Sequence, residues 1–184
     1  VVKFLVALQL GSKRQPESND KFVILQVPCY TEGEDSLKKS IDSLALLDYD
    51  DTRKLILLIA DGMIKGAGND LSSPEICLKI LGVDPEVVQA EPKSYIAIGD
   101  NMKQHNMGKV YSGLYYIQAR AVPFLLIVKC GTETETSRPG NRGKRDSQMI
   151  LMKFLNKVHY QRPMQPLDLE VYHHIKNVIG VDPY

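Results

Sequence analysis

The chain has 184 residues, with 23 basic and 22 acidic side chains and a formal net charge of +1. This balance argues against a general nucleic-acid-binding protein, which needs a surplus of positive charge. Hydrophobic residues make up 43% and charged residues 24%, as is typical of one globular domain. No apolar run approaches the roughly 18 residues that a transmembrane helix needs.

The cysteines indicate neither a zinc site nor a disulfide framework. Cys29, Cys77 and Cys130 are odd in number and far apart, and no Cys-x-x-Cys or Cys/His pair has zinc spacing. We therefore expect reduced thiols, as in a cytosolic setting.

The N-terminal part is expected to be separate from the domain. Residues 1–11 fit a short amphipathic helix, and the composition of residues 11–20 predicts a linker. The apolar run 22–27, which ends at Pro28, predicts a buried strand. The domain is therefore expected to cover residues 21–184.

The next elements alternate between helix and strand. A helix is predicted over residues 33–47, and Thr31 and Glu34 before it match a capping box. Residues 48–51 form a predicted turn, and the apolar run 54–60 predicts a second buried strand.

The second half continues this alternation after a loop. Residues 64–73 are a predicted loop, residues 74–81 a short helix, and residues 84–109 a polar, irregular segment. The last three predicted elements are a buried strand and two helices, over 121–130, 145–160 and 166–180.

This order of elements predicts an α/β fold, with a mixed, mostly parallel sheet and helices on both faces. Ligands of such sheets bind beyond the carboxyl ends of the strands. We expect the three predicted strands to end at one edge, which would bring Glu32, Asp61 and Lys144 together. The first two have simpler explanations, because Glu32 lies in a capping box and Asp61-Gly62 is a common turn pair.

The segment "SRPGNRGKRDSQMI", from Ser137 to Ile150, is a basic, glycine-rich turn before a helix. Glycines let the backbone approach a ligand, and four cations can balance a diphosphate. The cations are Arg138, Arg142, Lys144 and Arg145. The simpler explanation is a solvated loop, and the segment lacks the spacing of a P-loop.

Two other patterns do not predict a metal site. The histidines have no metal-ligand spacing; they are His105, His159, His173 and His174. Asp48-Tyr49-Asp50 matches an Asp-x-Asp string, but it lies between a helix and a strand, at the wrong edge of the sheet. We predict a turn there.

Six long stretches together resemble the chitin synthases of fungi, most of all the division that includes the myosin-headed forms. The resemblance runs from about Asp20 to Tyr184. It is carried by "DKFVILQVPCYTEGEDSLKKSIDSLA", "YDDTRKLILLIADGMIKGAGND", "LGVDP", "QHNMGKVYSGLY", "SRPGNRGKRDSQMILMKFLNKVHY" and "PLDLEVYHHIKNVIGVDP".

The resemblance implies a processive family-2 glycosyltransferase with a GT-A fold. Such an enzyme transfers N-acetylglucosamine from UDP-N-acetylglucosamine to a growing β-1,4-linked chitin chain of the fungal cell wall, with inversion and with a divalent metal, Mg or Mn. The resemblance also implies a parent protein embedded in the plasma membrane, with this domain on the cytoplasmic side and no nucleic-acid partner.

The resemblance further implies a set of UDP-sugar-binding residues. Those on the uridine side would be Pro28, Tyr30, Thr31 and Glu32, with Asp61 at the uracil. Those of the nucleotide-contacting turn would be Gly143, Lys144, Arg145 and Asp146.

The sequence also departs from the family pattern. Ala60 stands where the family usually has cysteine. The family's metal-binding Asp-x-Asp, its general-base acidic pair, its Q-x-x-R-W motif and its membrane helices are all expected beyond Tyr184. We therefore expect an N-terminal part of a catalytic domain, truncated before the Asp-x-Asp, with no catalytic residue or metal ligand and no activity alone.

Two alternatives remain open at this point. One is another processive UDP-sugar polymerase, similar to hyaluronan or cellulose synthases. Only the resemblance of the basic-turn sequence favours a chitin synthase over these. The other is a non-catalytic nucleotide- or phosphate-binding α/β module, which the 184 residues by themselves also fit.

Overall fold

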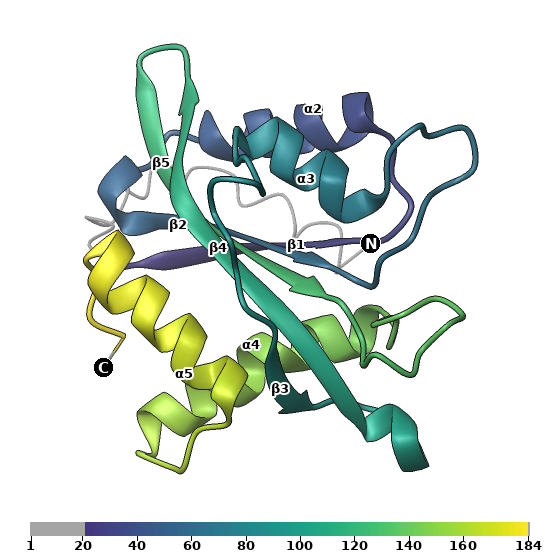
Figure 1. Cartoon of the computed structure of the whole chain (residues 1–184). Helices are drawn as coiled ribbons and strands as arrows, with labels where there is room; N and C mark the ends of the chain where they lie inside the picture. The colour runs from purple at the N-terminus through teal and green to yellow at the C-terminus, as the bar shows by residue number, and fades with distance from the viewer. Residues whose placement is uncertain (1–20, 184) are drawn as a thin grey trace, which may run out of the picture.

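The structure is a computed structural model that describes residues 21–183. The predicted helix 1–11 and linker 11–20 lie outside the described residues. Those that are described form a five-stranded sheet in the order β1-β2-β5-β4-β3, shown in Figure 1. The strands are β1 (Val23–Cys29), β2 (Lys54–Ala60), β3 (Lys93–Ile96), β4 (His105–Ile117) and β5 (Arg120–Lys129).

Strand direction confirms the predicted mixed, mostly parallel sheet. β1 pairs parallel with β2, and β2 pairs parallel with β5. β4 runs antiparallel to both β5 and β3, so four of the five strands share one direction. β1 continues through Pro28, a residue that a strand tolerates at the edge of a sheet.

The prediction that residues 84–109 are irregular was wrong. This stretch contains β3 and the start of β4, and the rest of β4 was also missed. Side chains along β4 alternate for much of its length between buried and more exposed positions, so the strand has no continuous apolar run. Its register is decided by pairing with β5, which sequence periodicity does not reveal.

Helices cover both faces of the sheet, as predicted (Figure 1). Helices α2 (Glu34–Ala45) and α3 (Ser73–Leu81) pack on one face. Helices α4 (Lys144–His159) and α5 (Pro166–His173) pack on the other, and α5 continues into a π-helical turn, His174–Ile179. Two short 3₁₀ turns, Asp51–Arg53 and Asn101–Gln104, precede β2 and β4. None of the helices in residues 21–183 is long and apolar enough to cross a membrane.

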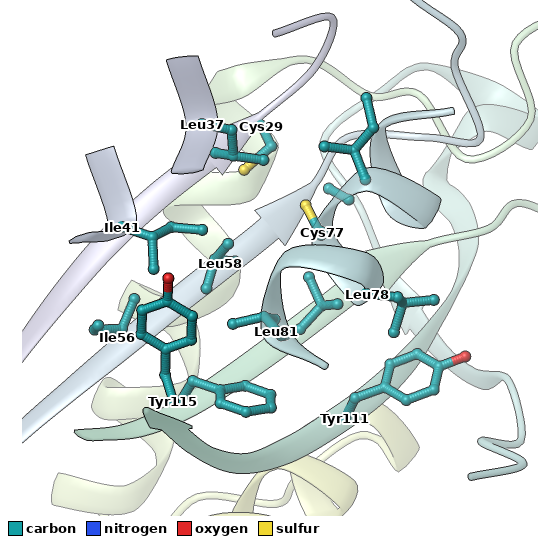
Figure 2. Close-up of a cluster of buried hydrophobic side chains, with 14 of the residues drawn as sticks. Cys29, Leu37, Ile41, Ile56, Leu58, Cys77, Leu78, Leu81, Tyr111 and Tyr115 are labelled. Carbon is teal, nitrogen blue, oxygen red and sulfur yellow. The ribbon is translucent and has the colours of Figure 1, made fainter. Parts of the chain in front are cut away.

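The continuous apolar character of β2 follows from this sandwich. Ile56 and Leu58 face α2 and α3, as Figure 2 shows, and the neighbouring leucines of β2 face α4 and α5. Cys29 and Cys77 lie in the first of these clusters, and all three cysteines are free. A hydrogen bond with Cys77, together with burial, raises the pKa of Cys29, so this cysteine is a protonated core thiol.

The predicted capping box at Thr31 was wrong. Gly33 is the N-cap of α2 and makes no side-chain cap, and Thr31 is exposed. The Glu34 carboxylate pairs instead with Lys79 of α3, at 2.7 Å. The Glu34 side chain, which the local sequence pattern predicted to cap α2, therefore forms an ion pair with a second helix.

The buried polar group at the amino edge of β2 is already paired. Lys54 is fully buried, and its ammonium contacts the carbonyls of Ala45 and Leu47, at 3.0 and 3.1 Å, and the Asp51 carboxylate, at 2.7 Å. These contacts place a cation at the C-terminus of α2, where the helix dipole favours it. The Asp48-Tyr49-Asp50 turn lies at this edge, opposite the carboxyl ends of the parallel strands.

Candidate functional site

The three parallel strands end at the same edge of the sheet. Cys29 of β1 is level with Ala60 of β2, and Ala60 is level with Val128 of β5. This edge is on the right of Figure 1, where the loop before α4 also lies. The prediction that the three strand ends meet at one edge is confirmed.

A cavity of about 390 Å³ opens at this edge. Six residues of the predicted set line it, together with two that were not predicted, Cys29 and Asn141. Thr31 and Arg145 are exposed and are not part of its lining, and Asp146 is buried behind it. The six predicted residues are Pro28, Tyr30, Glu32, Asp61, Gly143 and Lys144.

Asp61 anchors the basic turn to the end of β2. Its side chain is almost fully buried. One carboxylate oxygen, Oδ1, accepts from the backbone N–H of Arg142 at 3.0 Å and pairs with the Lys129 ammonium at 2.5 Å. The other, Oδ2, accepts from Nδ2 of Asn141 at 3.1 Å. Asp61 is therefore more than a turn residue, because it holds two successive residues of the loop.

Lys129 is a further residue at this site that sequence analysis missed. It is fully buried at the end of β5, and its ammonium lies between Asp61 and Asp146, 3.0 Å from the latter. A third contact, at 3.3 Å, goes to the carbonyl of Gly143. The available signal was a lysine directly after an apolar run, because a buried ammonium requires anionic partners.

Asp146 connects Lys129 to the other half of the sheet. Its carboxylate accepts from the backbone N–H of Ile98, at 2.7 Å, and from the Tyr95 hydroxyl, at 2.9 Å. Burial and the negative charge of Asp146 raise the pKa of Tyr95, so its hydroxyl stays a hydrogen-bond donor. The Asp146 carboxylate therefore points away from the cavity and into a satisfied polar network.

The four cations of the basic turn do not act together. The Arg142 guanidinium is buried and forms a two-pronged ion pair with Glu135; it also donates to the carbonyls of Lys103 and His105, at 2.5 and 3.0 Å. The hydrogen bonds between Arg142 and Glu135 raise the pKa of the arginine and lower that of the glutamate. Arg142 thus braces the loop and is not available to a diphosphate, which corrects the expectation of four convergent cations.

The remaining cations, Arg138, Lys144 and Arg145, are exposed, and of these only Lys144 lines the cavity. Lys144 is the first residue of α4, directly after the N-cap Gly143. The first turn of a helix carries unsatisfied N–H groups and a positive dipole end. The cavity therefore combines one exposed cation with a helix N-terminus, a combination that suits a phosphate.

A larger hollow, of about 560 Å³, lies beside the turn and is lined by Lys103, Glu135 and Arg142 among others. The guanidinium of Arg142 and the carboxylate of Glu135 in its wall already pair with each other, and this hollow does not include Asp61 or Lys144.

The acidic groups of the site do not fit a divalent metal. The carboxylates of Asp61 and Asp146 are separated by the Lys129 ammonium, which occupies the position that a cation would need. Across the described part of the chain, no three His, Cys, Asp or Glu side chains cluster as metal ligands do.

Comparison with known proteins identifies the relatives of this chain. A family model described as "Chitin synthase" matches residues 1–184. Chitin synthase csmA of Emericella nidulans is 62% identical over 183 residues, which is 100% of this chain and 10% of the relative. Chitin synthase 8 of Mycosarcoma maydis is 61% identical over 181 residues, 98% of this chain and 9% of the relative.

A third relative, chitin synthase 4 of Cryptococcus neoformans var. grubii, is 61% identical, with 98% of this chain and 14% of the relative covered. No solved structure matches the chain significantly. The chain spans only about a tenth of the length of the first two relatives. With the family model matched over its whole length, the chain belongs to the chitin synthase family.

Proposed function

We propose that this chain forms the donor-nucleotide pocket of a chitin synthase. The complete enzyme would transfer N-acetylglucosamine from UDP-N-acetylglucosamine to a growing β-1,4-linked chitin chain. The observation that carries the proposal is the cavity at the carboxyl edge of the sheet, where the Asp61 carboxylate, Lys144 and the N-terminus of α4 share one wall. A base needs a hydrogen-bond acceptor, which Asp61 would supply, and a diphosphate needs a positive end, which Lys144 and the helix N-terminus would supply.

The lining residues divide naturally between the parts of the nucleotide. Pro28 and the half-buried ring of Tyr30 offer an apolar wall for the base, with Asp61 accepting from a base N–H. One oxygen of Glu32 accepts from the backbone N–H of Tyr30 at 2.5 Å, which leaves the other for a ribose hydroxyl. Lys144 would hold a phosphate.

The other three residues of the predicted set take lesser roles in this proposal. Thr31 would flank the uridine from outside the cavity, and Arg145 would attract the diphosphate as a hydrated surface charge. Asp146 would act indirectly, through its ion pair with Lys129.

The divalent cation, Mg or Mn, remains a prediction for the complete enzyme, where it would neutralise the leaving diphosphate. The acidic residues near the cavity do not fit it, so its ligands would come from other parts of the protein.

A plasma-membrane location, with this domain on the cytoplasmic side, is likewise a proposal, as is the acceptor chain. A pocket for a cytosolic nucleotide-sugar is consistent with that side.

Sugar transfer distinguishes this proposal from the alternatives. A chitin synthase should incorporate N-acetylglucosamine from its UDP donor into an insoluble product that chitinase degrades. Incorporation of glucose or glucuronic acid would favour a cellulose- or hyaluronan-type polymerase. UDP binding without transfer by the full-length protein would favour a binding module.

Replacing Asp61 with alanine in the full-length enzyme is expected to weaken donor binding by about 10- to 100-fold, as for the loss of a hydrogen bond to a charged group. The KM for UDP-N-acetylglucosamine should rise more than kcat falls, because the base is remote from the bond that breaks. The fold should survive, because Lys129 keeps Asp146 as its partner.

Steady-state kinetics on Asp61→Ala and on Asp48→Ala, an exposed aspartate at the opposite edge, provide the measurement and its control. An unchanged donor KM in Asp61→Ala would count against a role at the base.

A further inference from the structure

We propose that Lys129 is a positioning residue that fixes the Asp61 carboxylate as an acceptor for an imide N–H, and that it thereby makes the cavity select uracil over cytosine. This inference rests on the proposed function, because it concerns the base of the bound nucleotide. Lys129 itself does not line the cavity and would act only through Asp61.

The hydrogen bonds of Lys129 leave it no capacity for a ligand. An ammonium has three donors, and here they contact Asp61, Asp146 and the Gly143 carbonyl, at 2.5, 3.0 and 3.3 Å. The side chain is fully buried, so these contacts are not exchanged for water. Lys129 therefore links β5 to the end of β2 and to the first turn of α4 through its ion pairs and hydrogen bond.

The ion pair with Lys129 determines which carboxylate oxygen of Asp61 can accept a further hydrogen bond. Oδ1 has two partners, the Lys129 ammonium and the backbone N–H of Arg142, which hold it toward the interior. Oδ2 has one partner, Nδ2 of Asn141. A carboxylate oxygen can accept two hydrogen bonds, so Oδ2 has capacity for one more. Asp61 lines the cavity, and we infer that this free acceptor position serves the ligand.

A fixed acceptor distinguishes the two pyrimidines. The N3 position of uracil carries a hydrogen and donates, whereas N3 of cytosine is itself an acceptor. A carboxylate at N3 binds the first and repels the second, and a buried polar group left without its partner discriminates strongly. Without Lys129, the Asp61 carboxylate would lose its strongest inward contact and could turn away from this orientation.

Lys54 provides a matched control for the loss of a buried lysine. It is also fully buried and paired with an aspartate, Asp51 at 2.7 Å, but it lies at the opposite edge of the same sheet. Replacing either lysine with methionine removes a buried ammonium and should lower the melting temperature. Only the change at Lys129 should alter base selection.

The test measures binding of UDP, CDP and 3-methyluridine diphosphate to the full-length enzyme by calorimetry. The unmodified enzyme is expected to bind UDP at least about 10-fold more tightly than the other two, which lack the N3 hydrogen. Lys129→Met should weaken UDP binding by about 10-fold or more, to near the level of CDP. Lys54→Met should keep the preference for UDP.

A double variant, Lys129→Met with Asp146→Asn, covers the case in which Lys129→Met does not fold. It removes one carboxylate together with the ammonium, so the net charge of the buried cluster is unchanged, and the same loss of preference is expected. A folded Lys129 variant that still prefers UDP would overturn the inference, as would an equal loss of preference in Lys54→Met.

The outcomes also separate this inference from the proposed function. If the unmodified enzyme binds UDP, CDP and the methylated analogue equally, base selection by Asp61 and Lys129 is wrong while the donor pocket stands. If the unmodified enzyme does not bind UDP at all, the donor pocket itself is wrong.

Discussion

Replacing Gly140 with alanine is expected to lower the free energy of unfolding by more than about 4 kcal/mol, among the largest effects of single substitutions. A Cβ at this position would lie 2.2 Å from the carbonyl oxygen of Lys129 and 2.8 Å from the backbone nitrogen of Cys130. These are main-chain atoms at the end of β5, which cannot move aside without disturbing the sheet. The φ angle of Gly140 is also positive, at 78°.

The surroundings of Gly140 allow little relaxation. Its N–H donates to the Glu135 carboxylate at 2.9 Å, and its carbonyl accepts from Nδ2 of Asn106 at 3.0 Å. A shift of the backbone that relieved the clash would therefore break hydrogen bonds on both sides of the residue. The basic turn is held where it crosses the end of β5 because residue 140 has no side chain.

Gly143 is the matched control for this prediction. Its φ is 84°, but a Cβ there would meet nothing within 4 Å. Gly143→Ala should therefore cost only the strain of its backbone conformation, φ 84° and ψ 163°, which other residues rarely adopt, about 1–3 kcal/mol. Denaturant unfolding of both variants, followed by circular dichroism, gives the comparison. Equal losses of stability would mean that positive φ, and not the close approach to β5, is what requires glycine at position 140.

Replacing Lys144 with alanine is expected to weaken UDP binding by about 10- to 100-fold, whereas Arg138→Ala should change it by less than about 3-fold. Lys144 lines the cavity at the N-terminus of α4, so its charge and the helix dipole can act on one phosphate. Arg138 is exposed and does not line that cavity. Arg145→Ala should fall between the two, because Arg145 is next to Lys144 but is not in the wall.

Binding of UDP to the three variants at low and high salt provides the measurement. A contribution from a hydrated surface charge is screened at high salt, whereas a phosphate contact that is partly shielded from water is less affected. The effect of Lys144→Ala should therefore persist at high salt, while the effect of Arg145→Ala shrinks. If Arg138→Ala weakens binding as much as Lys144→Ala, the turn acts as a diffuse electrostatic patch and Lys144 has no positioned contact.

The elements that sequence determined are those whose signal is local. The run 54–60 is apolar throughout because both faces of β2 are covered, and it was predicted with its observed bounds, Lys54–Ala60. Helix α4 was predicted from its apolar spacing to within one residue at each end, Lys144–His159. Parallel strands with helical crossovers also place their carboxyl ends at one edge, so the neighbourhood of Glu32, Asp61 and Lys144 followed from chain order alone.

Tertiary structure alone decided which polar groups pair. Lys129, Asp61 and Asp146 lie on three different elements, and nothing in their local sequence indicates that one ammonium joins the two carboxylates. Burial forces the pairing, because an ammonium without anionic partners is too costly inside a protein. Nothing in the sequence of the turn distinguishes Arg142 from the other cations, yet its guanidinium is already paired with Glu135 and donates to two carbonyls. Composition determined how much charge the turn carries; the packing of β4 and β5 against it determined that Lys144 is the cation in the cavity wall.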